Sequence, residues 1–156
     1  MASPSRRTSP SRGLLLDTSF LLPVLGFETS GRVMRSLPRL ARYRLYYSEL
    51  SILEALWKIS KYIQSLPEGQ RSGAMERVRQ GLEAIEDGME RAPVTAEAAA
   101  LALRLRLLGH RDMVDNLLYA TALSSGLKLL TVDEELRRFI ASKGLPASVL
   151  AAPEEV

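Results

Sequence analysis

The stretch "GLLLDTSFLLPV" (residues 13–24) decides the fold, because it places one carboxylate between two apolar runs. Its first part, Leu14–Leu16, is a short continuous apolar run, which is typical of a strand covered on both faces. Asp17 follows directly, although moving an unpaired carboxylate out of water costs several kcal/mol. The sequence therefore predicts a buried strand that ends at a residue needing a special environment.

Short apolar segments alternate with helical patterns along the rest of the chain. We expect strands at 13–17, 43–47, 92–94, 127–132 and 145–150. We expect helices at 18–27, 29–42, 48–66, 70–89, 95–108, 112–125 and 133–144. This alternation predicts a three-layer α/β/α fold around a central parallel sheet of four to five strands. In such sheets the chemistry lies beyond the carboxyl ends of the strands.

The composition excludes several classes of protein. With 46% hydrophobic and 25% charged residues, the 156-residue chain is not expected to be disordered as a whole. It has no cysteine and one histidine, His110, so disulfides, thiolate sites and histidine-rich zinc sites are excluded. No apolar run approaches the roughly 20 residues that span a bilayer, and the N-terminus lacks the apolar core of a secretion signal. We expect a cytoplasmic protein without membrane contact.

The net charge of +3 is concentrated at the N-terminus. Residues 1–12 carry three arginines and no acid, so the remainder of the chain is formally neutral. Their Ser, Pro and Arg content predicts a flexible basic extension, which is either incidental or a source of nonspecific attraction to phosphates. A single domain is expected over residues 13–152.

Four carboxylates stand in apolar surroundings. Asp17 and Asp133 each follow a predicted strand, while Glu54 and Asp115 lie in helices whose nearby residues are mostly apolar. Singly, each has an ordinary explanation, such as a helix N-cap, a surface position or a pair with a base. Together they would repel one another unless a proton or cation lay between them. An acidic cluster without cysteine is typical of Mg²⁺ or Mn²⁺ sites.

The motifs around these acids resemble those of the PIN domain, a family of metal-dependent nucleases that includes the VapC-type toxins. The segments "LLLDTSFLLPVL", "YSELSILEALW", "DMVDNLLYATAL" and "GLKLLTVDEEL" occur in the order and spacing of the four family motifs. Their acids are Asp17, Glu54, Asp115 and Asp133, and Thr131 with Asp133 matches the usual T-x-D. The long helix around residues 70–90 departs from the shortest toxins and leaves the substrate open.

The resemblance implies a PIN-like domain that acts as a Mg²⁺- or Mn²⁺-dependent endoribonuclease. It implies that the four acids are catalytic and ligate the metal, with Asp112 as an accessory ligand. Thr18, Asn116 and Thr131 would hydrogen-bond the ligands or the phosphate, although capping or helix packing explains Thr18 and Asn116 equally well. The expected partners are an RNA substrate, an antitoxin protein and a second copy of the chain in a homodimer.

A run of arginines forms a second candidate site. Residues 29–47 contain no acid, and the 3, 4, 3 spacing of four arginines places them on one helical face: Arg32, Arg35, Arg39 and Arg42. This face is either solvated or a ridge that contacts nucleic-acid phosphates on the way to the metal site. Arg111 and His110 lie near Asp115 and could contact phosphates in the same way.

Other functions remain open at this point. A housekeeping RNA-processing nuclease would carry the same acids as a toxin, and a non-cleaving RNA-binding regulator could keep the fold alone. A phosphatase or receiver-like domain also gathers acids at strand ends, but it would have two adjacent acids after the first strand. "LLLDTSF" lacks that pair.

Overall fold

The computed structural model describes residues 13–156, and the predicted extension at 1–12 lies outside the described residues. Five strands form one all-parallel sheet in the order β3-β2-β1-β4-β5. The strands are β1 (Leu14–Leu16), β2 (Leu45–Tyr47), β3 (Glu90–Arg91), β4 (Lys128–Leu130) and β5 (Leu150–Ala151). The predicted three-layer α/β/α fold with a parallel sheet is confirmed.

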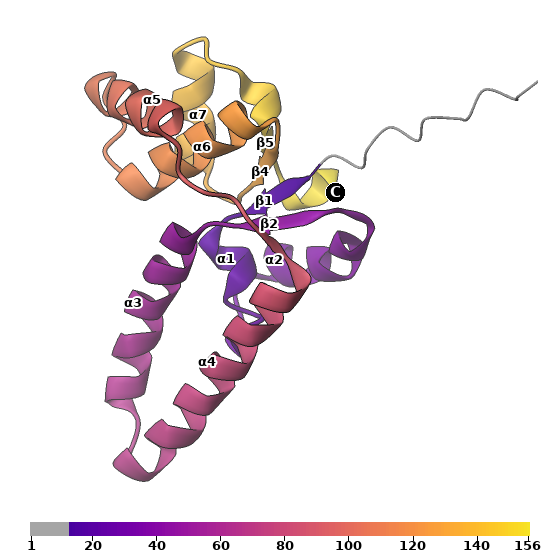
Figure 1. The fold of residues 1–156 in the computed structure, drawn as a ribbon, viewed down its shortest axis with the longest axis vertical. Coiled ribbons are helices and arrows are strands. Elements are labelled where there is room, and N and C mark those ends of the chain that lie inside the picture. The colour runs from indigo at the N-terminus through magenta and orange to yellow at the C-terminus, as the bar shows by residue number, and fades with distance from the viewer. Residues whose placement is uncertain (1–12) are drawn as a thin grey trace, which may run out of the picture.

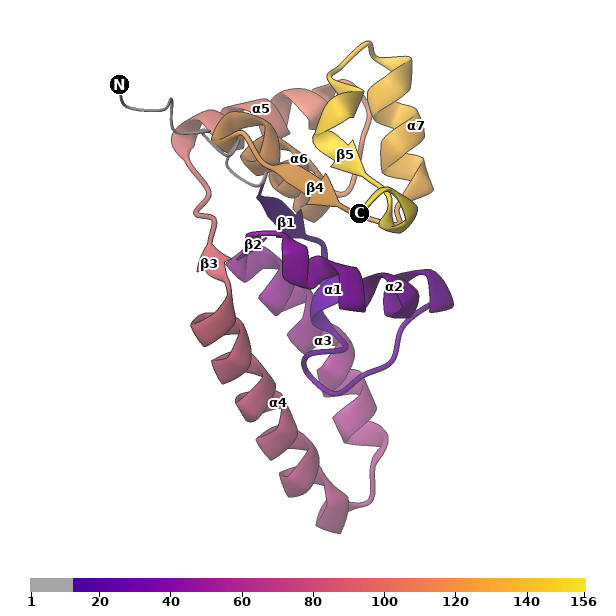
Figure 2. The ribbon, with the colours of Figure 1, turned by 90° about the vertical axis from the view of Figure 1, so that its right-hand side faces the viewer.

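Helices cover both faces of this sheet (Figures 1 and 2). One face carries α1 (Thr18–Leu21), α2 (Gly31–Ser36), α3 (Glu49–Ser65), α4 (Glu68–Gly88) and the 3-10 helix η1 (Leu37–Arg42). The other carries α5 (Ala96–Leu107), α6 (Met113–Ser125) and α7 (Glu134–Ser142). Two further 3-10 turns, η2 (Ala147–Val149) and η3 (Pro153–Glu155), flank β5. None of the helices within residues 13–156 is long and apolar enough to cross a membrane.

The alternation of side chains along β1 builds two separate cores. Leu14 and Leu16 point into the cluster beneath α1 to α4, while Leu15 points into the cluster beneath α5 to α7. All three are at most 1% exposed, as expected for the central strand of a parallel sheet. Burial on both faces fixes the strand, and it thereby fixes the position of the residue that follows it.

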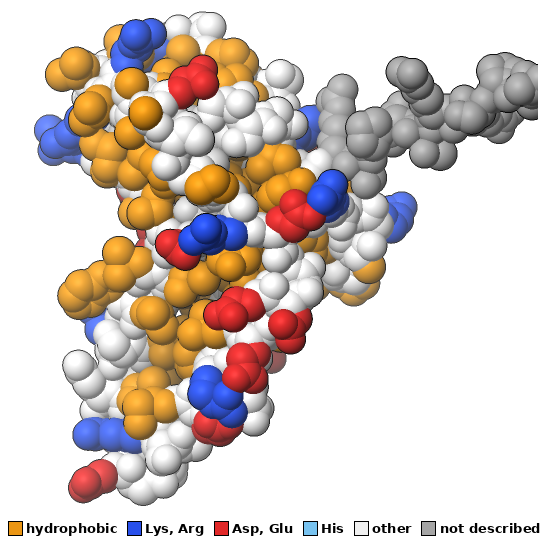
Figure 3. Space-filling model, viewed as in Figure 1, with side chains coloured by type: hydrophobic (Ala, Val, Ile, Leu, Met, Phe, Trp, Pro, Cys, Tyr) orange, Lys and Arg blue, Asp and Glu red, His pale blue; other side chains and the backbone are white. Residues whose placement is uncertain are grey.

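The helices α3 and α4 form a hairpin that projects from the body of the domain (Figure 1). Its α4 side carries charged pairs, including Arg79 with Glu76, whereas apolar side chains lie along the α3 side (Figure 3). Leu53 and Trp57 of α3 are 52% and 65% exposed. The hairpin therefore leaves an apolar strip of α3 in contact with solvent.

Several element boundaries predicted from sequence were wrong. The expected helix over 18–27 ends at Leu21 and is followed by turns as far as Gly26. The expected helix over 29–42 is divided into α2 and the 3-10 helix η1, because Pro38 lacks the N–H that an α-helix needs there. The third strand pairs with β2 through Glu90–Arg91 rather than 92–94. The last segment forms a 3-10 turn first, and only its end, Leu150–Ala151, pairs with β4.

Candidate metal-binding active site

The centre of the sheet contains a topological switch point. From β1 the chain continues to β2 on one side, while β4 pairs with β1 on the other side, in the register Leu16 with Leu130. Ligands of open parallel sheets bind beyond the carboxyl ends of the strands at such a point. Asp17 directly follows β1, and Thr131 and Asp133 follow β4. The fold thus brings the first and last of the predicted motifs to one edge.

Asp17 is fixed by hydrogen bonds on both of its oxygens. Its Oδ1 accepts from the N–H of Thr18 at 2.7 Å, which makes it the N-cap of α1. Its Oδ2 accepts from the hydroxyl of Thr131 at 2.8 Å. Burial raises the pKa of Asp17 above its usual range, although the two hydrogen bonds oppose this, and the negative charges of Glu54 and Asp133 raise it further. The carboxylate is held rigidly in a position where its charge is disfavoured.

Asp115 and Asp133 lie close enough to share a proton. Burial, this shared hydrogen bond and the neighbouring charges of Asp17 and Asp112 raise the pKa of Asp115 to about 9. Burial also acts on Asp133, but hydrogen bonds from Asp115 and from the N–H groups of Leu136 and Glu135 outweigh it and lower its pKa. Without a cation, the pair of carboxyl groups therefore holds one proton between them near neutral pH.

The amino ends of helices surround these acids. Asp112 is the N-cap of α6, where its Oδ1 accepts from the N–H of Asp115 at 3.1 Å. Asp133 caps α7 by accepting from the N–H of Leu136 at 3.0 Å. Together with Asp17 at α1, three of the predicted site acids are N-caps. Each lies where the positive end of a helix dipole stabilises a negative charge.

Glu54 is placed at the margin of this group. It lies on α3, its side chain is 29% exposed, and its Oε1 lies 3.5 Å from the Nζ of Lys58 one turn later. Its charge still raises the pKa of Asp17, so the two carboxylates lie within electrostatic reach. Glu54 therefore faces the site while bonded to a cation that can exchange.

Three of the predicted site acids, Asp112, Asp115 and Asp133, open onto a polar cavity of about 450 Å³, whereas Asp17 and Glu54 do not line it. Its lining residues are Gly109, His110, Arg111, Asp112, Asp115, Asp133 and Glu135. Arg111 and His110 thus share the cavity with four carboxylates, and such an arrangement can bind a phosphodiester beside the acids. The sequence patterns pointed to His110 and Arg111 only by proximity to Asp115, and they missed Glu135, because its turn of α7 carries no pattern beyond a helix start.

The supporting residues predicted from sequence have different roles. Thr131 links the two sides of the site, since its hydroxyl donates to Asp17 and accepts from the N–H of Asp133 at 3.1 Å. Asn116 instead bonds His110 twice. Its Oδ1 lies 2.7 Å from Nδ1 of His110, and its Nδ2 donates to the carbonyl of His110 at 2.9 Å. These bonds fix the loop that lines the cavity. The hydroxyl of Thr18 is buried without a hydrogen-bond partner.

The chemistry of these donors fits a hard divalent cation. All of them are oxygens, two of the carboxyl groups have raised pKa values, and an unsatisfied hydroxyl lies next to Asp17. Within residues 13–156, no three acidic or histidine side chains converge as they stand on a point that could hold an ion. Binding one ion through three of these side chains would therefore require some of them to move.

The predicted arginine face is only partly assembled. Arg32, Arg35 and Arg39 line one shallow cavity of about 260 Å³ together with Pro153 and Glu154. Arg42 lies in the 3-10 helix, is exposed, and does not join them, because the change of helix type alters the spacing of the face. The contact of this face with residues 153–156 could not be expected from the sequence, since the two segments are more than a hundred positions apart.

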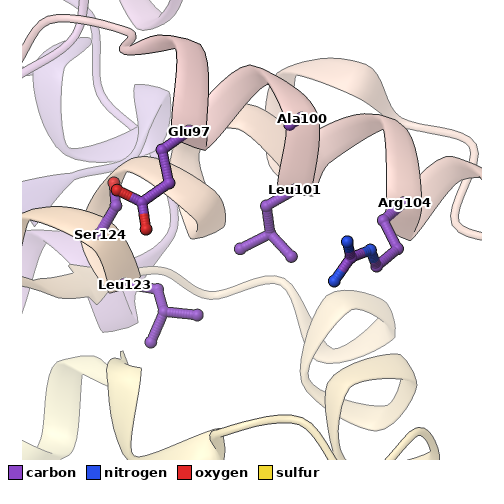
Figure 4. Close-up of a pocket in the computed structure, with 6 residues that line it drawn as sticks. All are labelled: Glu97, Ala100, Leu101, Arg104, Leu123 and Ser124. Carbon is purple, nitrogen blue, oxygen red and sulfur yellow. The ribbon is translucent and has the colours of Figure 1, made fainter.

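A separate cavity of about 470 Å³ lies between α5 and α6 (Figure 4). Glu97 and Arg104 stand toward its two ends, with Leu101 between them and Leu123 and Ser124 opposite. One carboxylate among mostly apolar and neutral groups offers no cluster for metal or acid–base chemistry. The acidic cavity is therefore the better candidate for an active site.

Comparison with known proteins agrees with this architecture. Residues 14–141 match the PIN domain family, whereas no curated protein sequence matches the chain. Among solved structures, FitAcB from Neisseria gonorrhoeae is similar with a TM-score of 0.64 and 20% identity, over 92% of this chain and 99% of that one. VapBC2 from Rickettsia felis, bound to a DNA fragment from its promoter, is similar with a TM-score of 0.60 and 15% identity, over 90% of this chain and 98% of that one. PAE2754 from Pyrobaculum aerophilum is similar with a TM-score of 0.59 and 19% identity, over 92% of this chain and 90% of that one. The likeness of the structures establishes the fold, and the match over most of the chain shows that it belongs to the PIN domain family.

Proposed function

We propose that this chain is a Mg²⁺- or Mn²⁺-dependent endoribonuclease and the toxin of a toxin-antitoxin pair. The observation that carries the proposal is the group of Asp17, Asp115 and Asp133 at the switch point of the sheet. Two of them have raised pKa values, so the site favours a positive charge between its carboxyl groups. Family membership supports nuclease chemistry at this place.

Asp17, Asp115 and Asp133 would hold the ion, with Glu54 and the accessory Asp112 at its margin. A divalent ion bound there supplies a water of lowered pKa and stabilises charge on the departing oxygen. Thr131 keeps Asp17 and the start of α7 in fixed relation. Thr18 is the remaining hydroxyl beside Asp17 that can bond a ligand.

The basic residues of the cavity bind and orient the substrate. Arg111 and His110 line the same cavity as Asp115 and Asp133, so they can hold a phosphodiester with its phosphorus facing these carboxylates. Asn116 fixes His110 by two hydrogen bonds and so limits the freedom of this loop. The RNA backbone is thereby positioned without any contact to a base, which predicts weak sequence preference from this part of the site.

The partners follow from the relatives and from the surface. The structure from Klebsiella pneumoniae is described as a toxin-antitoxin complex, and it is 17% identical with a TM-score of 0.56. We propose that a small antitoxin blocks the acidic cavity of this chain by inserting an Arg or Lys that replaces the metal charge. A homodimer is proposed as well, and the exposed apolar strip on α3 offers surface for protein contacts.

Cleavage of RNA tests the proposal directly. A fluorescent pool of single-stranded RNA is incubated with the purified protein in Mn²⁺, in Mg²⁺ or in EDTA. We expect cleavage only with a divalent ion, and its loss in D115N but not in D87N, since Asp87 is an exposed acid on α4. Binding without cleavage under all conditions would instead indicate a non-cleaving RNA-binding protein. Unchanged cleavage by D115N would refute the assigned site.

Co-expression tests the toxin role separately. If the neighbouring small gene encodes the antitoxin, co-expression should suppress cleavage and raise the yield of soluble protein. Full activity in a verified complex would leave an RNA-processing nuclease as the better description.

A further inference from the structure

Residues 153–156 lie against α2 (Figure 2). Two of their side chains are buried and two are charged and exposed. Pro153 and Val156 are buried, and Val156 joins the core beneath α1 to α4. Glu154 and Glu155 between them are exposed. The segment is therefore held by its apolar residues, so the carboxylate of Glu154 can exchange partners without undoing the packing, whereas that of Glu155 also accepts from the N–H of Ala152 at 3.1 Å.

Two arginines of α2 and η1 meet this segment in different ways. Arg39 donates from Nε to the carbonyl of Val156 at 2.7 Å and from Nη2 to the carbonyl of Pro153 at 2.9 Å. Arg32 instead donates to both carboxylate oxygens of Glu154, at 2.7 Å and 3.0 Å. Arg39 thus clamps the main chain, whereas Arg32 makes the two-pronged contact that guanidinium also makes with a phosphate.

The Arg32 contact borders the acidic site. Its Nη1 lies 3.5 Å from Oε1 of Glu134, the residue that follows Asp133. The side chain of Arg32 is 38% exposed and that of Glu154 is 57% exposed. The pair is strong enough to lower the pKa of Glu154 to about 2, yet it stands in solvent, where ion pairs exchange readily.

We propose that Glu154 is a displaceable stand-in for a substrate phosphate, which covers Arg32 in the free protein and yields it to a phosphodiester of bound RNA. The inference rests on the proposed function, because it takes the RNA backbone to run past α2 toward Asp133. Arg32 and its neighbour Arg35 then contact RNA, while Arg39 holds the segment in place throughout. The charged side of residues 153–156 acts as a built-in competitor that weakens RNA binding.

Binding measurements without metal ions separate this inference from catalysis. Fluorescence anisotropy records the affinity of a 20-nucleotide single-stranded RNA, and of the DNA of the same sequence, in EDTA and low salt. The variants are E154Q, R32Q and the double variant. E76Q is the matched control, because Glu76 is also an exposed acid bonded to an arginine but lies on the projecting hairpin. Thermal midpoints verify that each variant is folded.

E154Q is expected to bind both oligonucleotides about two- to fivefold more tightly than the parent, the effect of freeing one exposed ion pair. E76Q should change affinity little, and R32Q should abolish the gain in the double variant. Equal gains in E154Q and E76Q, a gain that survives R32Q, or no binding by parent and E154Q would each overturn the inference. Cleavage of RNA by the parent with Mn²⁺ decides the proposed function independently of these results.

Discussion

Replacing Asp115 by asparagine should stabilise the metal-free protein, and the gain should grow with pH. In the folded parent the pKa of Asp115 is about 9, whereas the ordinary value for the residue is 3.8. Between these values the folded state holds a proton that the unfolded chain releases, so the stability of the parent falls as pH rises. Asparagine does not titrate, so the stability of D115N does not fall with pH for this reason, and its amide can still donate to Asp133.

The magnitude follows from the width of the pH window. One pH unit within the window changes the free energy of unfolding by about 1.4 kcal/mol per proton. From pH 5 to pH 7 the upper limit is thus about 3 kcal/mol, and side-chain relaxation reduces it to about 1–3 kcal/mol. The lowered pKa of Asp133 adds nothing here, because that group is ionised in both states above about pH 5.

Urea denaturation at pH 5, 6 and 7 in EDTA measures the effect. The difference between D115N and the parent should widen steadily with pH, while the difference between D87N and the parent should stay constant. Parallel stability curves for D115N and the parent, or a gap that narrows with pH, would refute the proton-sharing arrangement of Asp115 and Asp133.

Three further changes test other parts of the structure. Mn²⁺ should raise the thermal midpoint of the parent but not of D17N, since Asn keeps the N-cap and loses the charge; equal shifts would remove Asp17 from the metal site. T131V should destabilise the protein by about 1–3 kcal/mol, because Asp17 and the N–H of Asp133 both lose the Thr131 hydroxyl as a hydrogen-bond partner. An unchanged free energy of unfolding in urea would contradict this. G81A should destabilise it by about 1–3 kcal/mol, because a Cβ there would lie 2.5 Å from the carbonyl oxygen of Val24; an unchanged urea midpoint would show that α4 can shift.

The sequence predicted the layers of the fold because the central strand β1 is buried on both faces and β4 beside it is largely buried. The runs of leucine in β1 and β4 are typical of the buried strands of a parallel sheet. Gly126, with a φ of 68°, ends α6 at the expected position. Short edge strands were predicted poorly. Glu90–Arg91 is polar and exposed, so its pairing with β2 depends on the end of α4 and not on local pattern.

The candidate site was predictable in its acids but not in its arrangement. Asp17, Asp115 and Asp133 were found because carboxylates are rare in apolar surroundings, and the structure gathers them. The proton between Asp115 and Asp133 depends on distances that no spacing encodes. The ion pair between Arg32 and Glu154 likewise arises from tertiary packing between segments that lie far apart in the described chain.

The bond between Asp17 and Thr131 has a consequence for synthesis of the chain, because its two residues are 114 positions apart. During translation the first strand emerges early and waits for β4, so β1 lacks its central neighbour until most of the domain has left the ribosome. Asp133 emerges at the same late moment. A nascent chain, or a fragment released before residue 131, therefore carries Asp17 without the strand and the hydroxyl that fix it, and the site cannot assemble until residues 131–133 have been made.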